Sequence, residues 1–129
     1  MFLITLSGRG VLIGLLMLFV GNKEIVEDVV IKKVIDGNVH LQHMTIRHMK
    51  GTGVHGQSFF TMEDVIVEQC GGFGVGAKGT GVVGRCTNIE VRDCECSGVV
   101  ASEGASITLI GAKTTVHHNC TNSSDDYGL

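Results

Sequence analysis

The sequence contains no proline and no tryptophan, and aromatic residues make up only 5% of its 129 positions. It also lacks an excess of positive charge, because the formal net charge is −3. Without a basic footprint, the chain does not fit a dedicated nucleic-acid-binding protein. The scarcity of aromatic side chains weakens the case for a sugar-binding surface built on stacked rings.

Glycine, in contrast, is abundant, with 19 residues. Abundant glycine without proline excludes collagen and proline-rich linkers, and it is typical of chains with many tight turns. Hydrophobic residues make up 43% of the sequence, and many of them are the β-branched residues that favour strands. A chain of this length has room for one domain. The composition therefore indicates a single all-β domain.

The five cysteines are Cys70, Cys86, Cys94, Cys96 and Cys120. An odd number cannot pair completely within one chain, and no C-x-x-C spacing is present for zinc. We interpret them as small apolar residues of a reduced protein. Among the six histidines, His117 and His118 are adjacent, so a strand would point them to opposite faces. The sequence predicts no metal site and no cofactor.

The N-terminal region contains a ten-residue apolar run at residues 11–20. This run is too short to cross a membrane as a helix, which takes about 20 residues. Residues 1–21 could be a signal or anchor segment with Arg9 as its charged flank, although no small-residue cleavage site follows. Alternatively, residues 1–37 form a cap or an irregular rung over the open end of a β-structure. The recurrence of ITLSG at residues 4–8 as ITLIG at residues 107–111 favours the cap.

Residues 38–129 contain four similar units. Each unit has an equivalent apolar residue, and these are separated by 21, 24 and 25 positions: Ile46, Val67, Val91 and Val116. In the first three units a glycine follows seven residues later, and a valine comes directly after it: Gly53, Gly74 and Gly98 with Val54, Val75 and Val99. We expect these glycines to permit sharp turns between strands. The period does not match the longer, helical ankyrin and tetratricopeptide repeats.

These features predict a single-stranded right-handed parallel β-helix, or solenoid, of about four rungs, each stacked about 4.8 Å from the next. Side-chain alternation predicts which residues point inward. In one strand these are the pairs Met44/Ile46, Val65/Val67, Ile89/Val91 and Thr114/Val116. In the next strand they are Val54/Gly56, Val75/Ala77 and Val99/Ala101.

Three segments of the repeat resemble the units of right-handed parallel β-helix repeat proteins of the pectate-lyase-like superfamily. These segments are GNVHLQHMTIRHMKGTGV, TMEDVIVEQCGGFGV and CTNIEVRDCECSGVV. They look most similar to uncharacterised members encoded by large DNA viruses of algae and protists. The resemblance implies the fold but no particular activity, because this scaffold carries lyases, hydrolases, adhesins and inert spacers. A viral origin would place the protein in the virion or the host cytoplasm, whereas a signal peptide at residues 1–21 would make it secreted.

Equivalent outward positions of the rungs should form a ladder of Arg47, Glu68, Arg92 and His117. One interpretation is a series of cross-strand ion pairs on a solvated face, each contributing about 0.2–1 kcal/mol. The other is a binding surface for a charged or hydroxyl-rich chain such as a polysaccharide, with these four residues as its contacts.

The sequence offers no convincing catalytic residues, because the carboxylates of Glu63, Asp64 and Glu68 do not converge as glycoside hydrolysis would require. We therefore expect a non-catalytic structural or interaction protein, in which the open ends of the β-helix promote self-association. The alternative is a carbohydrate-binding or polysaccharide lyase- or hydrolase-like protein, or a remnant of one. Neither nucleic acid nor a membrane is an expected partner.

Overall fold

The structure is a computed structural model that describes residues 3–8, 24–26, 37–47 and 51–121. All regular secondary structure within these ranges consists of strands. The strands are β1 (Leu3–Gly8), β2 (Glu24–Val26), β3 (Gly37–Arg47), β4 (Val54–Gly56), β5 (Phe60–Glu68), β6 (Val75–Lys78), β7 (Val83–Thr87), β8 (Glu90–Arg92), β9 (Val99–Ser102), β10 (Ser106–Ile110) and β11 (Thr115–His117).

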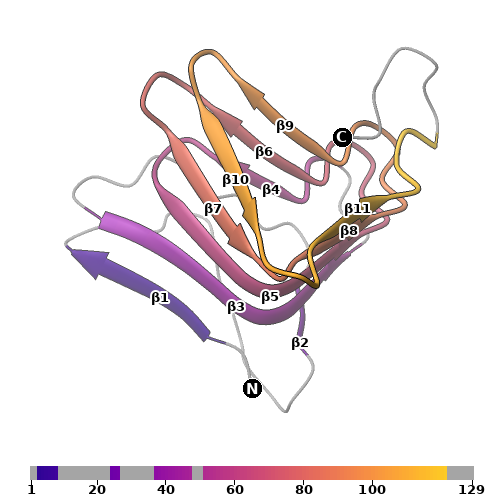
Figure 1. The fold of residues 1–129 in the computed structure, drawn as a ribbon, viewed down its shortest axis with the longest axis horizontal. Helices are drawn as coiled ribbons and strands as arrows, with labels where there is room; N and C mark the ends of the chain where they lie inside the picture. The colour runs from indigo at the N-terminus through magenta and orange to yellow at the C-terminus, as the bar shows by residue number, and fades with distance from the viewer. Residues whose placement is uncertain (1–2, 9–23, 27–36, 48–50, 122–129) are drawn as a thin grey trace.

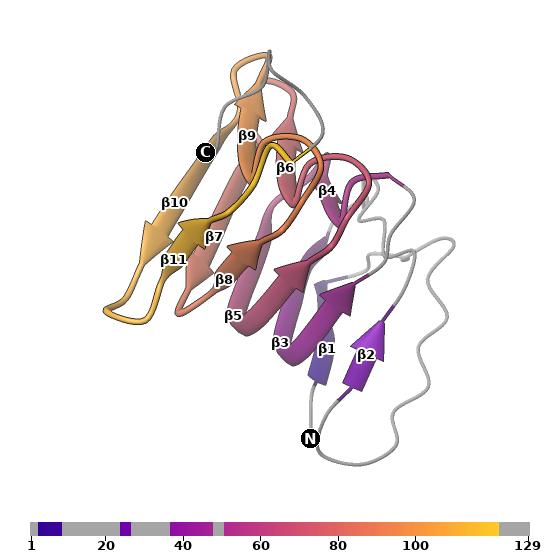
Figure 2. The same ribbon diagram turned by 90° about the vertical axis from the view of Figure 1, so that its right-hand side faces the viewer.

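The strands stack as the rungs of a parallel β-solenoid of about three turns (Figures 1 and 2). One sheet has the order β1-β3-β5-β7-β10. Beyond a corner, β8 follows β7 and β11 follows β10, so that β8 pairs with the second half of β5 and β11 pairs with β8. The second sheet has the order β4-β6-β9. All pairs are parallel except that of β1 with β3. The predicted all-β solenoid is therefore confirmed.

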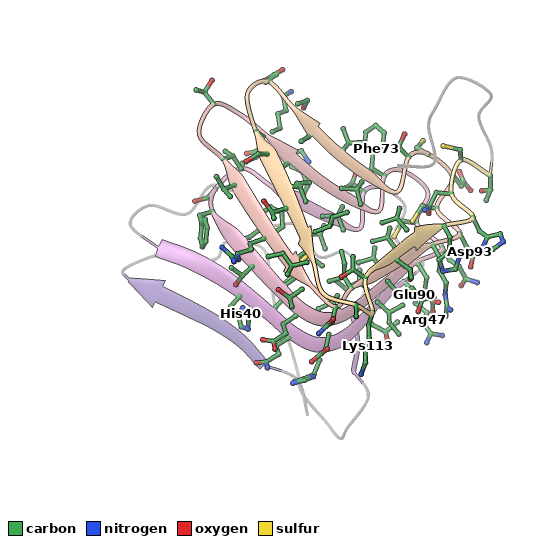
Figure 3. The ribbon with its side chains drawn as sticks, viewed as in Figure 1. His40, Arg47, Phe73, Glu90, Asp93 and Lys113 are labelled. Carbon is green, nitrogen blue, oxygen red and sulfur yellow. The ribbon has the colours of Figure 1, made fainter. Side chains whose placement is uncertain are left out.

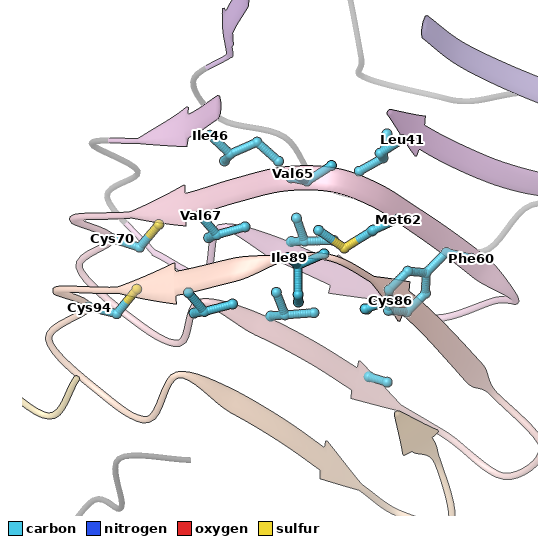
Figure 4. Close-up of a cluster of buried hydrophobic side chains, with 14 of the residues drawn as sticks. Leu41, Ile46, Phe60, Met62, Val65, Val67, Cys70, Cys86, Ile89 and Cys94 are labelled. Atoms are coloured by element: carbon cyan, nitrogen blue, oxygen red, sulfur yellow. The ribbon is translucent and has the colours of Figure 1, made fainter. Parts of the chain in front are cut away.

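The predicted register is confirmed in both sheets. Ile46 pairs with Val67, Val67 with Val91, and Val91 with Val116. In the second sheet Val54, Val75 and Val99 are aligned in the same way. These positions face inward, where they form a continuous core with Leu41, Phe60, Met62 and Ile89 (Figure 4).

One aromatic ring fills the corner of this core. Phe60 is fully buried, and its ring lies where side chains of Gly56 and Gly84 would otherwise be. A Cβ atom added to Gly56 would lie 2.2 Å from the ring, and one added to Gly84 would lie 2.4 Å from it. The neighbouring Phe59 is exposed. The two glycines therefore make room for Phe60.

The glycines that precede the strands of the second sheet have a different role from the expected one. We expected Gly53 and Gly74 to provide conformational freedom for sharp turns, but neither adopts a positive φ. Both lack space for a side chain. A Cβ on Gly53 would lie 2.8 Å from the Gly74 carbonyl oxygen, and one on Gly74 would lie 2.6 Å from the Gly98 carbonyl oxygen. Close approach of successive rungs therefore requires glycine at these positions.

The corner of the larger sheet is made by stacked residues in the left-handed backbone conformation. His43, Asp64 and Asn88 have φ values of 54°, 52° and 51°, and Gly111 follows in the last rung at 101°. Asparagine, aspartate, histidine and glycine are the residues that tolerate this conformation best. In the last rung the corner is wider, because its register places two additional residues between Ile110 and Thr115.

At the N-terminal edge, β1 lies antiparallel along β3, and β2 pairs with the other half of β3 in parallel. The apolar run at residues 11–20, which is either a cap or a targeting segment, lies outside the described residues. The predicted domain boundary at residue 37 therefore stays a prediction. Within the described ranges, no helix has the length and apolar character needed to cross a membrane.

Candidate functional site

The predicted outward ladder is present in the expected register. Arg47 pairs with Glu68, Glu68 with Arg92, and Arg92 with His117 across successive rungs. Arg92 donates from Nε and Nη2 to Glu68 Oε2 at 2.9 and 2.7 Å. Arg47 Nε lies 3.3 Å from Glu68 Oε1. Glu68 is therefore held between two guanidinium groups, one on each neighbouring rung.

Glu90 adds a second carboxylate to this charged ladder. It lies two residues before Arg92 on the same face, and its Oε1 accepts a hydrogen bond from Arg92 Nη1 at 3.0 Å. His117 Nε2 lies 3.0 Å from the same oxygen. The hydrogen bond with His117 is the main cause that lowers the pKa of Glu90, and the positive charge of Arg92 adds to it. Figure 3 shows Arg47, Glu90 and Asp93 gathered on one side of the solenoid.

Burial decides how the charged ladder can act. Glu68 is only 8% exposed, and its interaction with Arg92 raises the pKa of that guanidinium. Arg47 Nε is buried without a well-aligned hydrogen bond. The two arginines and the two glutamates thus pair with one another on the partly exposed outer face. The ladder therefore has the geometry of a clamp between successive rungs on the outer face, and its role as a polysaccharide contact stays a prediction.

The cysteines beside this ladder line the interior. Cys70 and Cys94 are fully buried on consecutive rungs (Figure 4), and all five cysteines are present as thiols rather than disulfides. Burial raises the pKa of the Cys86 thiol to about 12, whereas the hydrogen bond with Cys70 lowers that of Cys94. In the described part of the chain, no group of three or more potential ligand residues could hold a metal ion.

A groove of about 290 Å³ crosses the outer face of the second sheet. Its floor is Gly76, which stacks between His55 on β4 and Val100 on β9. Because Gly76 has no side chain, the space above it stays open between these two neighbours. The remaining lining residues are Thr52, Phe73, Ala77, Lys78 and Ser102. We call this feature the outer groove; it combines an aromatic ring, hydroxyl groups, an imidazole and an ammonium group.

The C-terminal end of the solenoid is the third candidate. Strands β9, β10 and β11 are the last of their ladders, and no strand among the described residues pairs with their far edges. Ile107, Leu109 and Val116 point inward but are only partly buried. We call the outer edges of β9, β10 and β11 the terminal edge.

Sequence reasoning found the charged ladder because its members recur at the rung spacing. It missed Glu90, which has no charged equivalent on the rungs beside it: Ile66 precedes it and Thr115 follows. The outer groove was also missed, although a glycine at an outward strand position between larger neighbours was a usable signal. No protein-family model matches the chain, and no match is found among curated protein sequences or among solved structures.

Proposed function

We propose that the protein is a structural or interaction module without catalytic activity, and that it contacts its partner through the terminal edge. The observation that carries this proposal is the incomplete burial of Ile107, Leu109 and Val116 at an edge with no described neighbour. Covering these side chains would remove apolar surface from water, and each Å² of apolar surface buried in this way contributes about 25 cal/mol of stabilising free energy.

The composition of β10 supports the same proposal. Exposed strand edges in monomeric proteins are commonly protected by lysine, proline or inward-pointing charge. Strand β10 has the sequence SITLI, which contains none of these. Its residues are strand formers, and among the described residues no strand pairs with the backbone groups of its far edge. Such an edge is suited to strand addition, in which backbone hydrogen bonds provide affinity.

The test compares the size of the wild-type protein with that of two lysine variants. Ile107→Lys places a charge at the terminal edge, where Ile107 is only partly buried. Water can reach this charge in the monomer, whereas an interface at the terminal edge would exclude water from it. Gln57→Lys adds the same charge at an exposed position outside the terminal edge. We expect light scattering to show assemblies larger than one chain for the wild type and Gln57→Lys, and monomers for Ile107→Lys with unchanged circular dichroism. A wild-type protein that is monomeric at all concentrations would refute the proposal.

A second candidate function is carbohydrate binding in the outer groove. Phe73 could stack against a sugar face, Lys78 could pair with a uronic-acid carboxylate, and the hydroxyls of Thr52 and Ser102 could bond to sugar hydroxyls. The matched variants are Phe73→Ala and Gly76→Val. The latter would fill the groove, since an added Cβ meets only ordinary contacts of 3.6 Å and longer. Binding on a polysaccharide array, with and without calcium, should be lost in both; wild-type silence across the array removes this candidate.

Two finer parts of the interpretation remain proposals as well. These are kinship with the pectate-lyase-like superfamily and an origin in a large DNA virus. Both rest on the likeness of the repeat units within residues 38–129.

A further inference from the structure

We propose that the partner at the terminal edge is a second copy of this chain, bound so that β10 of one copy pairs antiparallel with β10 of the other around a two-fold axis at Thr108. This inference rests on the proposed function and specifies its partner. A two-fold contact uses the same patch on both copies and therefore closes at two chains.

The hydrogen bonds of β10 define which backbone groups are available. Ser106 N donates to the Val82 carbonyl at 2.9 Å, and Asn88 N donates to the Ile110 carbonyl at 2.9 Å. Along a strand, the N–H and C=O groups of one residue point to one neighbouring strand, and those of the next residue point to the other side. Because Ser106 and Ile110 bond to the preceding rung, the N–H and C=O groups of Ile107 and Leu109 point to the open edge.

Those two residues fit an antiparallel partner in one register. If Thr108 faces Thr108 of the second copy, Ile107 of each chain lies opposite Leu109 of the other. Both residues of each such pair then present their N–H and C=O groups to one another, as a hydrogen-bonded antiparallel pair requires. The side chains of Ile107 and Leu109 point inward, so the same contact would join the two cores.

The fold itself contains an example of this pairing. The edge of β3 on the N-terminal side accepts β1 in antiparallel orientation, with Ile4 opposite Leu41 and Leu6 opposite Val39. Strand β1 includes Ile4-Thr5-Leu6, and β10 includes the same triplet as Ile107-Thr108-Leu109. An Ile-Thr-Leu strand thus lies antiparallel on one outermost rung of the solenoid, and an identical triplet forms the edge at the opposite end.

Charge complementarity also favours a second copy. The turn before β10 contains Glu103, and the turn after it contains Lys113 (Figure 3); both are exposed. In the two-fold arrangement the positive end of each β10 approaches the negative end of the other. Two symmetry-related Lys113–Glu103 pairs would flank the uncharged strand pair, which fixes its antiparallel orientation.

The experiment introduces a cysteine at the two-fold axis. Facing residues of a non-hydrogen-bonded antiparallel pair have Cα atoms about 4.5 Å apart, which lies within the range of a disulfide. We expect mild oxidation of Thr108→Cys to shift the mass from one chain to two, with the bond mapped to residue 108 of each copy. In the control Ser106→Cys, the two cysteines would lie about 13 Å apart along the strands and should stay unlinked.

The outcomes separate this inference from the function on which it rests. A protein that is larger than one chain but links at Ser106→Cys as readily as at Thr108→Cys, or at neither, overturns the two-fold pairing and leaves the terminal edge as an interface. A protein that stays monomeric in wild-type form and links in neither variant overturns both. The wild type is oxidised in parallel, so that bonds from the native thiols are recognised. Circular dichroism of both variants shows that the fold is retained.

Discussion

At the scale of single residues, the charged ladder depends on carboxylates that each contact two basic side chains. Glu68 is almost completely removed from water and contacts arginines on both neighbouring rungs. Removing one partner of a buried ion pair costs more than the pair contributes, because the remaining charge is left without compensation. The function of this ladder is therefore best tested at Glu90, which is less buried than Glu68.

The lowered pKa of Glu90 predicts a pH-dependent contribution to stability. A carboxyl group whose pKa is lower in the folded state stabilises the fold above its unfolded pKa, about 4.5 here, and loses that effect as the pH falls through the folded pKa. We expect Glu90→Gln to lower the melting temperature at about pH 6, and we expect its difference from the wild type to shrink as the pH falls below 4.5. Thermal melts across this range provide the measurement. A difference that is constant with pH would show that Glu90 does not act through its charge.

Burial of Cys86 predicts low chemical reactivity. Its thiol is fully buried and its pKa is raised to about 12, so the reactive thiolate is scarce at neutral pH. Cys70 and Cys94 are also fully buried, whereas Cys96 and Cys120 are partly accessible. We expect intact-mass analysis after brief alkylation to show at most two labels on the native protein and five on a urea-unfolded control. Rapid labelling of a third thiol in the native protein would contradict this assignment.

At the scale of elements, the packing of β5 against β4 and β7 is set by Phe60 and its two glycines, Gly56 and Gly84. The ring leaves no space for a Cβ on Gly84. We expect Gly84→Ala to reduce the free energy of unfolding by about 1–3 kcal/mol through overpacking.

The smaller side chain of Phe60→Leu should relieve part of this clash. The double variant is thus expected to lose less stability than the two single variants combined, as measured by urea unfolding. If the stability losses of the two single variants simply add in the double variant, the added methyl group of Gly84→Ala is accommodated by residues other than Phe60.

The rung register was predictable because inward apolar residues and the following glycines recur together. A one-residue slip would turn Ile46, Val67 and Val91 out of the core, so the pattern allows one alignment. The left-handed corner was not predictable in the same way. His43, Asp64 and Asn88 share a backbone conformation rather than a residue type, and β3 and β5 pass through it without a break. Glycines that serve close packing look like turn glycines in a sequence.

At the scale of the whole molecule, the two ends of the described solenoid differ in how their outermost strands are covered. Stability in stacked repeats comes from each rung and its neighbours, so a terminal rung with one neighbour is the weakest and normally needs a cap. The outermost rung on the N-terminal side has β1 and β2 along its edge, whereas Ile107 and Leu109 on the last rung remain partly exposed. Pairing two copies at the terminal edge would give each last rung a second neighbour.

The charges that flank β10 provide the last prediction. In the two-fold dimer Lys113 of each copy faces Glu103 of the other, so Lys113→Glu would place like charges together at two symmetric positions. Removing two exposed pairs of about 0.2–1 kcal/mol each should raise the dissociation constant by about 2-fold to 30-fold, and the added repulsion in Lys113→Glu should raise it further. Adding Glu103→Lys to the same chain reverses both charges and should restore the dimer, although it also removes the 3.4 Å pair between Lys78 and Glu103 within each chain.

Sedimentation equilibrium of the wild type, both single variants and the double variant measures these constants. Raising the salt concentration should reduce the differences, because exposed pairs are screened over a distance of about 8–10 Å at physiological ionic strength. Lys113→Ala serves as the control that removes the attraction without adding repulsion, and its dissociation constant should lie between those of the wild type and Lys113→Glu. If the double variant dissociates more readily than either single variant, the two charges do not face each other, and the register centred on Thr108 is wrong.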